Sequence, residues 1–220
     1  MSAPPPDLVV YLVRHGEKFN DDDSTVGLSR QGCMRAHALV GYFRVVLGCD
    51  VAPDGVYAGN DTSQRPLKTV VPLARSYGMV VQSPTSTDDV STMARLLIDA
   101  ASRRPCRRRP YIAIVAWQHG TLSALAVALG APPDFPSFPD SHYDVTIRIE
   151  RRQCGAVVRT SVAAQQVLPS DNDDVPNRYA PYAITAADDP LAFERRCATC
   201  AIGCETQVAS ASCACCTRHT

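Results

Sequence analysis

The sequence predicts an α/β fold, a three-layer αβα sandwich around a mostly parallel central sheet. Two short apolar runs, residues 8–13 and 111–117, contain β-branched residues and stop at polar ones, which is typical of strands buried on both faces. Other stretches place apolar residues three and four positions apart, which is typical of helices that pack on a sheet. Because strands and helices alternate along the chain, we expect one layered domain.

The composition allows one folded domain with a remainder and excludes several other classes of protein. Of the 220 residues, 45% are hydrophobic, which excludes full-length disorder and a collagen-like repeat. The 22 basic and 22 acidic residues cancel, so no general attraction to nucleic acid or to a membrane is expected. Residues 1–6 contain no lysine or arginine, and the apolar run 8–13 is short. Neither a secretory signal nor a membrane span is therefore expected, and we expect a location in the cytosol, with the nucleus as the alternative.

The first half of the chain is expected to contain three strands and two helices. Ser29 is a suitable N-cap, and Gly48 a suitable stop, for the first helix. In the second helix Pro66 suits the first turn, whereas Pro72 is expected to kink or interrupt the helix. The predicted strands of this half are 8–13, 55–58 and 79–82.

The second half is expected to continue the alternation and to end in a hairpin. Residues 87–89 supply N-cap side chains for a helix that ends near Ser102, and Gly130 closes the helix after the second buried strand. The hairpin is expected at the edge of the sheet because its two strands alternate in polarity. The predicted elements are a strand over 111–117, a helix over 121–129 and hairpin strands over 144–150 and 156–162.

The folded domain is expected to comprise residues 1–168 and to be followed by a tail, residues 169–220. The tail has no periodic apolar stripe, so we expect it to be disordered. Six of the ten cysteines lie in its last 24 residues and are expected to be reduced thiols or metal ligands. Cys197, Cys200 and Cys204 are candidates for a zinc site, but their spacing matches no regular zinc finger, and a flexible low-complexity end is favoured.

Two of the predicted buried strands end in a histidine, one at Arg14-His15 and the other at His119. Because the carboxyl ends of parallel strands line the ligand crevice of an open sheet, both imidazoles are expected to face one site. Arg65 lies where a turn enters a helix, so an arginine and a helix N-terminus are expected to meet there. Two histidines and two arginines together favour a dianion such as phosphate.

Four motifs occur in order along the chain: residues 12–17 (LVRHGE), residues 28–32 (LSRQG), residues 63–66 (SQRP) with Thr69, and His119 followed by Gly120. Together they resemble the motifs of the histidine phosphatase superfamily, which has the phosphoglycerate mutase-like fold. Four motifs in the family's order are more specific than a single Arg-His-Gly. The resemblance extends over residues 8–165, and the compact outline is similar to the small phosphatase branches.

The resemblance implies a metal-independent phosphatase without a cofactor, in which His15 is the nucleophile. A neutral imidazole attacks phosphorus and forms a phosphohistidine, which water hydrolyses. Arg14, Arg65 and a protonated His119 would hold the equatorial oxygens of the phosphoryl group. These neighbouring cations also disfavour protonation of His15. The expected partner is a small phosphorylated substrate or a phosphoprotein, and no oligomeric state is predicted.

Two functional positions depart from the family pattern. Family members carry a carboxylic acid after the second-arginine helix that protonates the leaving oxygen, and here this region offers Asp88 and Asp89. Either is a candidate, and a residue not yet identified or the substrate itself are further alternatives. Asn20 lies one position closer to the histidine than the phosphate-contacting asparagine of the mutases and is a candidate substrate contact.

A hydrolase is favoured over the alternatives because the longer insertions and the Trp-Gly segment of the mutases are missing. A phosphoglycerate-mutase-type phosphotransferase is the second possibility. The third is a catalytically weak protein that binds phosphorylated ligands and acts through its cysteine-rich tail. We interpret His37 and His142 as surface residues. The arginine-rich residues 103–109 are interpreted as a solvated loop, since 20 of the 22 basic residues are arginine and such clusters therefore mean less here.

Overall fold

The computed structural model describes residues 7–19, 27–48, 50–103, 109–152, 157–172 and 174–184. The predictions for Asn20, for Cys197, Cys200 and Cys204, and for a disordered tail beyond residue 184 lie outside these residues. Within them the chain forms one five-stranded sheet, four α-helices and a short 3₁₀ helix, η1 (Asn177–Tyr182).

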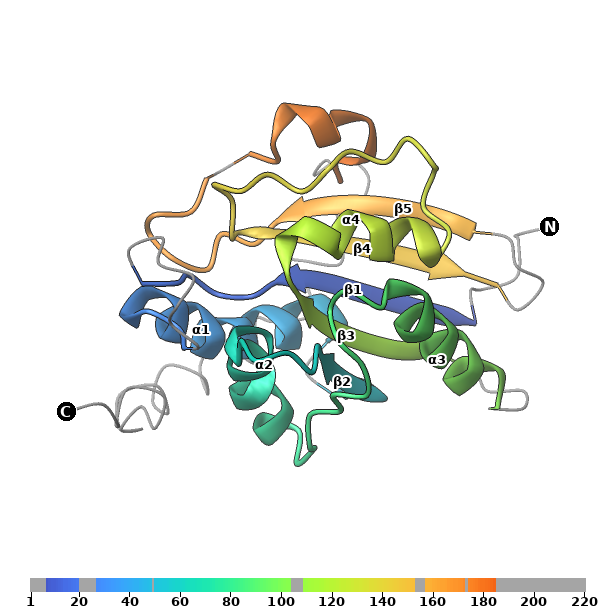
Figure 1. Cartoon of the computed structure of the whole chain (residues 1–220), viewed down its shortest axis with the longest axis horizontal. Helices are drawn as coiled ribbons and strands as arrows, with labels where there is room; N and C mark the ends of the chain where they lie inside the picture. Colours follow the sequence, from blue (N-terminus) through green and yellow to red (C-terminus); the bar gives the residue numbers. More distant parts are fainter. Residues whose placement is uncertain are drawn as a thin grey trace.

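The central sheet is mixed, with the strand order β2-β3-β1-β4-β5 (Figure 1). β1 and β2 both pair in parallel with β3, whereas β4 is antiparallel to β1 and β5 is antiparallel to β4. The predicted α/β class is confirmed, and the sheet is mixed because the predicted hairpin extends it on one side. The strands are β1 (Leu8–Arg14), β2 (Gly55–Ala58), β3 (Tyr111–Trp117), β4 (Val145–Arg151) and β5 (Val157–Ala164).

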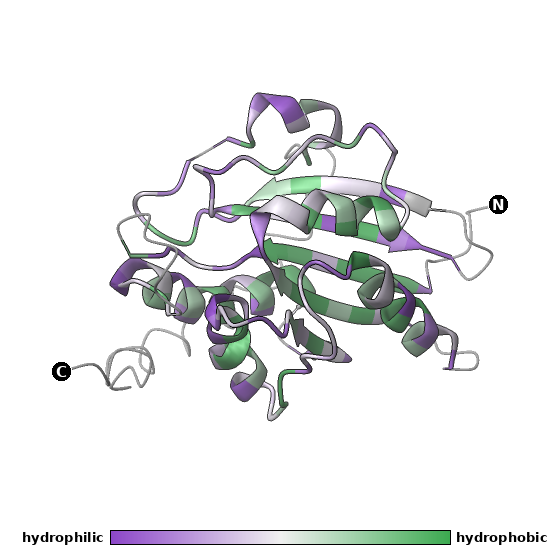
Figure 2. Cartoon of the chain, in the orientation of Figure 1, coloured by the Kyte–Doolittle hydropathy of each residue, from purple (hydrophilic) through white to green (hydrophobic). Residues whose placement is uncertain are grey.

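Two pairs of helices cover the two faces of the sheet, which confirms the predicted three layers. Alternate residues of β1 enter opposite hydrophobic clusters: Val9 joins Phe43, whereas Val10 joins Leu97. Figure 2 shows the hydrophobic residues concentrated on the strands. No helix in the described part of the chain is both long and apolar enough to cross a membrane. One pair is α1 (Arg30–Leu47) and α2 (Arg65–Ser76), and the other is α3 (Val90–Ser102) and α4 (His119–Ala128).

Local signals set three helix ends as predicted, two on α1 and one on α3. The Ser29 hydroxyl accepts a hydrogen bond from the backbone N–H of Gly32 at 3.1 Å and caps α1. Gly48 ends that helix with a φ of 92°, a conformation that favours glycine. Asp89 caps α3 by accepting a hydrogen bond from the N–H of Thr92 at 3.1 Å. The residues at these helix ends could therefore be predicted from the sequence.

Three details differ from the sequence prediction. Helix α2 is not interrupted at Pro72 but continues to Ser76, because its buried face holds the helix against the sheet and α1. Residues 79–82 form a single bridge, from Gln82 to Tyr57, instead of a strand; Met79 and Val81 pack against the core, whereas Val80 is 84% exposed. Helix α4 begins at His119 instead of at residue 121, which places this histidine in its first turn.

The described residues beyond 168 pack on the domain, although the sequence predicts a tail from residue 169. Tyr179 is completely buried, with its ring centre 5.4 Å from that of Phe135 and 6.4 Å from that of Phe138. Ala183 forms a bridge with Val162 of β5. A periodic pattern is missing because this packing is made by a 3₁₀ helix and irregular chain, which have no long repeat to detect.

Replacing Tyr179 by alanine is expected to lower the free energy of unfolding by about 3 kcal/mol, because a cavity would remain beside Phe135 and Phe138. Urea unfolding followed by circular dichroism measures this change. The matched control is Asn177→Ala, at an exposed position of the same 3₁₀ helix, which should change the free energy by less than about 0.5 kcal/mol. Equal effects of the two substitutions would contradict the packing of this segment.

Candidate active site

The candidate site lies at the edge of the sheet where the parallel strands end. The register pairs Arg14 at the end of β1 with Trp117 at the end of β3, and the backbone N–H of His15 donates to the Trp117 carbonyl at 3.0 Å. His119 follows Trp117 by two residues, so the chain brings both predicted histidines to this edge. The β2 strand ends at the same edge and leads to Arg65 at the start of α2.

His15 is buried and held in one orientation. Its Nδ1 lies 2.8 Å from the carbonyl oxygen of Gly16, and because a carbonyl only accepts, Nδ1 carries the proton. In the neutral ring Nε2 is then the nitrogen with the free lone pair. Burial lowers the pKa of His15 from 6.5 to about 4, against the hydrogen bond to Gly16, which raises it. The positive charges of Arg14 and Arg65 contribute to this lowered pKa, so His15 is neutral at physiological pH.

The loop after His15 lies directly against α1 and α2. A Cβ added to Gly16 would lie 2.8 Å from the backbone oxygen of Gly32, and a Cβ added to Gly32 would lie 2.4 Å from the backbone oxygen of Glu17. Only glycine allows this close approach. The N–H of Gly16 donates to the Thr69 hydroxyl at 2.8 Å, and that hydroxyl donates to the Arg65 carbonyl at 2.8 Å. These hydrogen bonds join the predicted motif at residues 12–17 to the predicted motif at residues 63–66 with Thr69.

A buried ion network holds the next residue of the loop. Arg35 donates to the Glu17 carboxylate at 2.7 Å and to the Asp171 carboxylate at 2.6 Å. Burial alone would lower the pKa of Arg35, but its hydrogen bonds to the two carboxylates raise it. Burial likewise opposes ionisation of Asp171, yet the hydrogen bond from Arg35 lowers its pKa. Arg35 and Asp171 were not predicted from the sequence, because no motif links residues so far apart in the chain.

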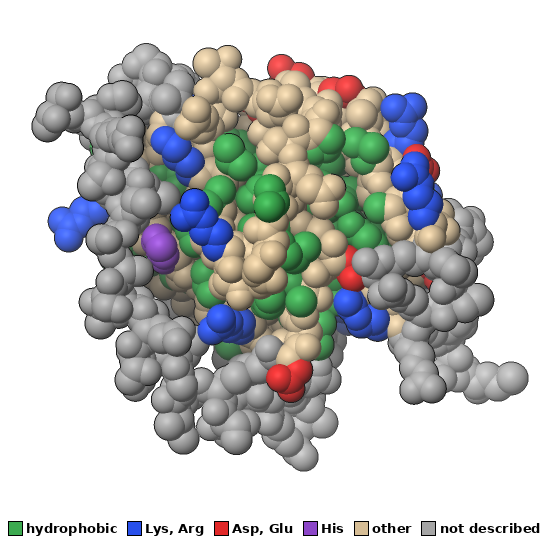
Figure 3. Space-filling view, turned by 90° about the horizontal axis from the view of Figure 1, so that it is seen from below, with side chains coloured by type: hydrophobic (Ala, Val, Ile, Leu, Met, Phe, Trp, Pro, Cys, Tyr) green, Lys and Arg blue, Asp and Glu red, His purple; other side chains and the backbone are tan. Residues whose placement is uncertain are grey.

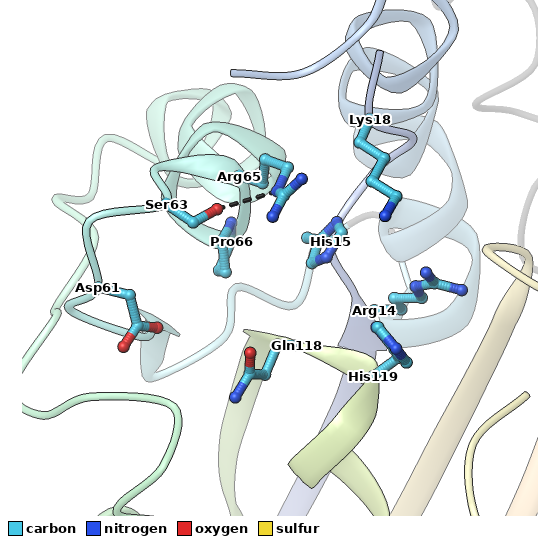
Figure 4. A pocket seen from close by; sticks show the side chains of 9 residues that line it. All are labelled: Arg14, His15, Lys18, Asp61, Ser63, Arg65, Pro66, Gln118 and His119. Atoms are coloured by element: carbon cyan, nitrogen blue, oxygen red, sulfur yellow. Dashed lines mark hydrogen bonds between the residues drawn. The ribbon is translucent and has the colours of Figure 1, made fainter. Parts of the chain in front are cut away.

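These groups border a cavity of about 220 Å³, in which the predicted Arg14, His15, Arg65 and His119 come together (Figure 4). Arg65 is 8% exposed, and its Nε donates to the Ser63 hydroxyl at 2.9 Å. Ser63 and Pro66, which belong to the predicted motif at residues 63–66, also line the cavity. Three further lining residues were not predicted from the sequence: Lys18, Asp61 and Gln118.

Arg14 is bound to the loop that precedes β4. Its Nη1 donates to three carbonyl oxygens, including that of His142 at 2.9 Å, and its guanidinium carbon lies 3.8 Å from the centre of the Tyr143 ring. Burial lowers the pKa of Arg14, although the nearby carboxylates of Asp140 and Glu17 act in the opposite direction. The other two carbonyl oxygens belong to Pro139 and Asp140.

His119 contacts the same loop. Its Nε2 lies 3.2 Å from Oδ1 of Asp140, which is 88% exposed, while the His119 side chain is 34% exposed. When protonated, His119 forms an ion pair with this carboxylate. Because Asp140 is open to solvent, an anion that enters the cavity can compete with it for His119.

The two predicted proton donors, Asp88 and Asp89, have different surroundings. Neither is one of the described residues that line the cavity. Asp89 caps α3, and hydrogen bonding from Thr92 lowers its pKa. Asp88 is exposed and accepts a hydrogen bond from Nε2 of Gln118 at 2.9 Å, and Gln118 does line the cavity. Asp61 lines it as well, with its carboxylate accepting from the N–H of Thr87 at 3.1 Å.

The remaining surface shows no concentration of ligand groups in the described part of the chain. No cluster of three or more His, Cys, Asp or Glu side chains suited to a metal occurs among the described residues. On the face drawn in Figure 3, the Lys and Arg side chains are scattered and do not form one patch. His37 is exposed on α1 and lies outside the cavity.

Neither a family model nor a curated protein matches the chain. Solved structures of histidine phosphatase superfamily members match it over 68–77% of its length. A phosphoglycerate mutase from Plasmodium falciparum has 14% identity over 69% of this chain and 87% of its own, with a TM-score of 0.49. The protein histidine phosphatase SixA has 15% identity over 69% and 95%, with a TM-score of 0.48. A mycobacterial glucosyl-3-phosphoglycerate phosphatase has 16% identity over 68% and 96%, with a TM-score of 0.47.

His15 is expected to make stability depend on pH. Its pKa of about 4 lies below the ordinary 6.5, so between these values the unfolded chain binds a proton that the folded protein does not. The free energy of unfolding therefore falls as the pH is lowered through this range, by about 3 kcal/mol for this group. The measurement compares the free energy of unfolding of wild type with that of His15→Ala, at pH 7 and near pH 4. If the difference in the free energy of unfolding between the two proteins is the same at both pH values, the pKa of His15 is not lowered.

Proposed function

We propose that this protein is a metal-independent phosphomonoesterase that works through a phosphohistidine at His15. The observation that carries the proposal is a buried, neutral imidazole with Nδ1 held by Gly16, in a cavity shared with Arg65 and His119. A neutral imidazole is a nucleophile, and surrounding cations suit a phosphate dianion. The substrate is a small phosphorylated molecule or a phosphoprotein.

The proposed reaction has two steps. In the first, the Nε2 lone pair of His15 forms a bond to phosphorus, the bond from phosphorus to the ester oxygen breaks, and that oxygen takes a proton from an acid. In the second, water attacks the phosphohistidine and gives a proton to the carboxylate that the acid became in the first step, the bond between phosphorus and nitrogen breaks, and phosphate leaves with His15 and the acid restored. Arg65 and His119 stabilise the negative charge on the phosphoryl oxygens in both steps.

Asp88 is the better of the two candidates for the acid. A proton donor must bind a proton during part of the cycle, and the hydrogen bonds that cap α3 keep Asp89 ionised. Asp88 does not cap the helix, and its hydrogen bond to Gln118 connects it to the cavity wall. A leaving group that extends from the cavity past Gln118 would meet this carboxyl group.

His15→Ala is expected to reduce phosphate release from p-nitrophenyl phosphate at least about a thousandfold in excess EDTA, because the nucleophile is lost. Wild type should also yield an acid-labile phosphoenzyme that the variant lacks. His37→Ala, at an exposed histidine outside the cavity, is the matched control and should keep its activity.

Other outcomes of this experiment favour the alternatives. Phosphate binding with turnover that is unchanged by His15→Ala would indicate a protein that binds phosphorylated ligands. Phosphoryl exchange between the carbons of a sugar acid that outpaces phosphate release would indicate a mutase.

Asp88→Asn is expected to slow hydrolysis of an alkyl phosphate at least about a hundredfold, and that of p-nitrophenyl phosphate far less. The reason is that an alkoxide needs a proton to leave, whereas nitrophenolate does not. The ratio of kcat/KM for the two substrates measures the effect. Asp89→Asn is the matched control and should leave both unchanged, because asparagine also caps a helix. If Asp88→Asn lowers kcat/KM equally for both substrates, Asp88 is not the proton donor.

A further inference from the structure

The cavity carries positive groups on one side and a carboxylate on the other. In Figure 4, Arg14 and His119 lie on one side of His15. Asp61 lies on the opposite side, beyond Pro66. It is the single acidic side chain among the described residues that line the cavity. A ligand that occupies the whole cavity therefore meets cations with one end and a carboxylate with the other.

The positive end of the cavity fixes where the phosphoryl group of a substrate would bind. Arg14 is 2% exposed, and its Nε is a buried donor without a hydrogen-bond partner in the structure. A buried donor without a partner costs free energy, so an anionic ligand that accepts from it is stabilised. With the phosphoryl group held there, beside His15, the rest of the ligand extends toward Asp61.

Asp61 is held in place by the segment that precedes α3. Its Oδ1 accepts hydrogen bonds from the Ser86 hydroxyl at 2.7 Å and from the Thr87 N–H at 3.1 Å, and the same N–H lies 3.2 Å from Oδ2. A carboxylate has about four acceptor positions. Because Oδ2 takes only a share of one N–H, it can accept a further hydrogen bond from a ligand. The side chain is ordered beforehand, which lowers the cost of binding.

The negative charge on this side of the cavity is not balanced by a cation. Among the described residues, the donors to Asp61 and to the neighbouring Asp88 and Asp89 are hydroxyl, amide and backbone N–H groups. A hydrogen bond to a carboxylate from a charged donor is stronger than one from a neutral donor. A positively charged group on the ligand is therefore favoured over a hydroxyl group at this place.

We propose that Asp61 is a specificity-determining residue that binds an ammonium group on the leaving group of the substrate. The preferred substrates are then small phosphomonoesters of amino alcohols. This inference rests on the proposed function and narrows its substrate class. It favours a small molecule over a phosphoprotein, because the amine of a phosphorylated serine is consumed in the peptide bond.

Binding tests this inference without turnover. 3-Aminopropylphosphonate and butylphosphonate have chains of the same length and differ by an ammonium in place of a methyl group, and their bond from phosphorus to carbon is not an ester bond. By calorimetry at pH 7, wild type should bind the aminoalkyl compound at least about tenfold more tightly. Equal affinities, or no measurable binding of the aminoalkyl compound, would overturn the proposal.

Asp61→Asn should abolish this preference. Asparagine keeps the shape of the side chain, and its carbonyl oxygen still accepts from Ser86 and Thr87, so only the charge is removed. The matched control is Asp134→Asn, at an exposed position that is not among the described residues lining the cavity, and it should keep the preference. An unchanged denaturation midpoint shows that Asp61→Asn is folded. A preference that persists in this variant would contradict the role of Asp61.

Turnover provides a second measurement with O-phosphoethanolamine and propyl phosphate, which differ in the same way. Asp61→Asn should lower kcat/KM for O-phosphoethanolamine at least about tenfold and change that for propyl phosphate by less than about twofold. The acidity of each leaving group is the same for both proteins, so it cancels in this comparison. Equal losses on the two substrates would show that Asp61 does not recognise the ammonium group.

The outcomes separate this inference from the proposed function. If wild type forms the phosphoenzyme but Asp61→Asn changes neither affinity nor turnover, the role of Asp61 is wrong and the phosphatase proposal stands. If wild type forms no phosphoenzyme, yet prefers the aminoalkyl phosphonate in a manner that depends on Asp61, the catalytic proposal fails. Asp61 then remains the residue that selects an ammonium group in a bound ligand.

Discussion

A buried network of charges joins Glu17, Arg35 and Asp171 and fixes the loop that carries His15. Arg35 lies 2.7 Å from one carboxylate and 2.6 Å from the other, and all three side chains are nearly inaccessible to solvent. Removing Arg35 would leave two buried carboxylates without their shared cation, so the network depends on this arginine. It connects the loop after β1, the first helix and the segment after β5. The geometry of the site therefore depends on parts of the chain that are far apart in sequence.

The burial that orders this loop also sets the chemistry of the histidine. His15 is 4% exposed, and the loss of hydration is the largest cause of its lowered pKa. The close contact between Gly16 and Gly32 seals the loop against α1, and the Gly16 carbonyl fixes the proton on Nδ1. One local conformation thus buries the imidazole, keeps it neutral and leaves Nε2 as the basic nitrogen.

The antiparallel half of the sheet completes the other side of the site. Because β4 runs opposite to β1, the loop before β4 arrives at the edge where β1 and β3 end. That loop receives the hydrogen bonds of Arg14 and places Asp140 beside His119. A sheet with parallel strands alone would bring the start of its next strand to the opposite edge. The hairpin is therefore part of the architecture of the site.

The sequence by itself determined the layered fold, most element boundaries and the meeting of His15, Arg65 and His119, because burial, capping and strand ends leave local patterns. It did not reveal the role of residues 169–184, since irregular chain has no period, and it predicted a strand over 79–82 where the chain forms a single bridge to Tyr57. Tertiary structure alone decided that Lys18 and Gln118 line the cavity, that Arg35 meets Asp171 and that Arg14 turns to the loop before β4. These contacts join separate elements, so they exist only once the strand order has brought those elements to one edge of the sheet.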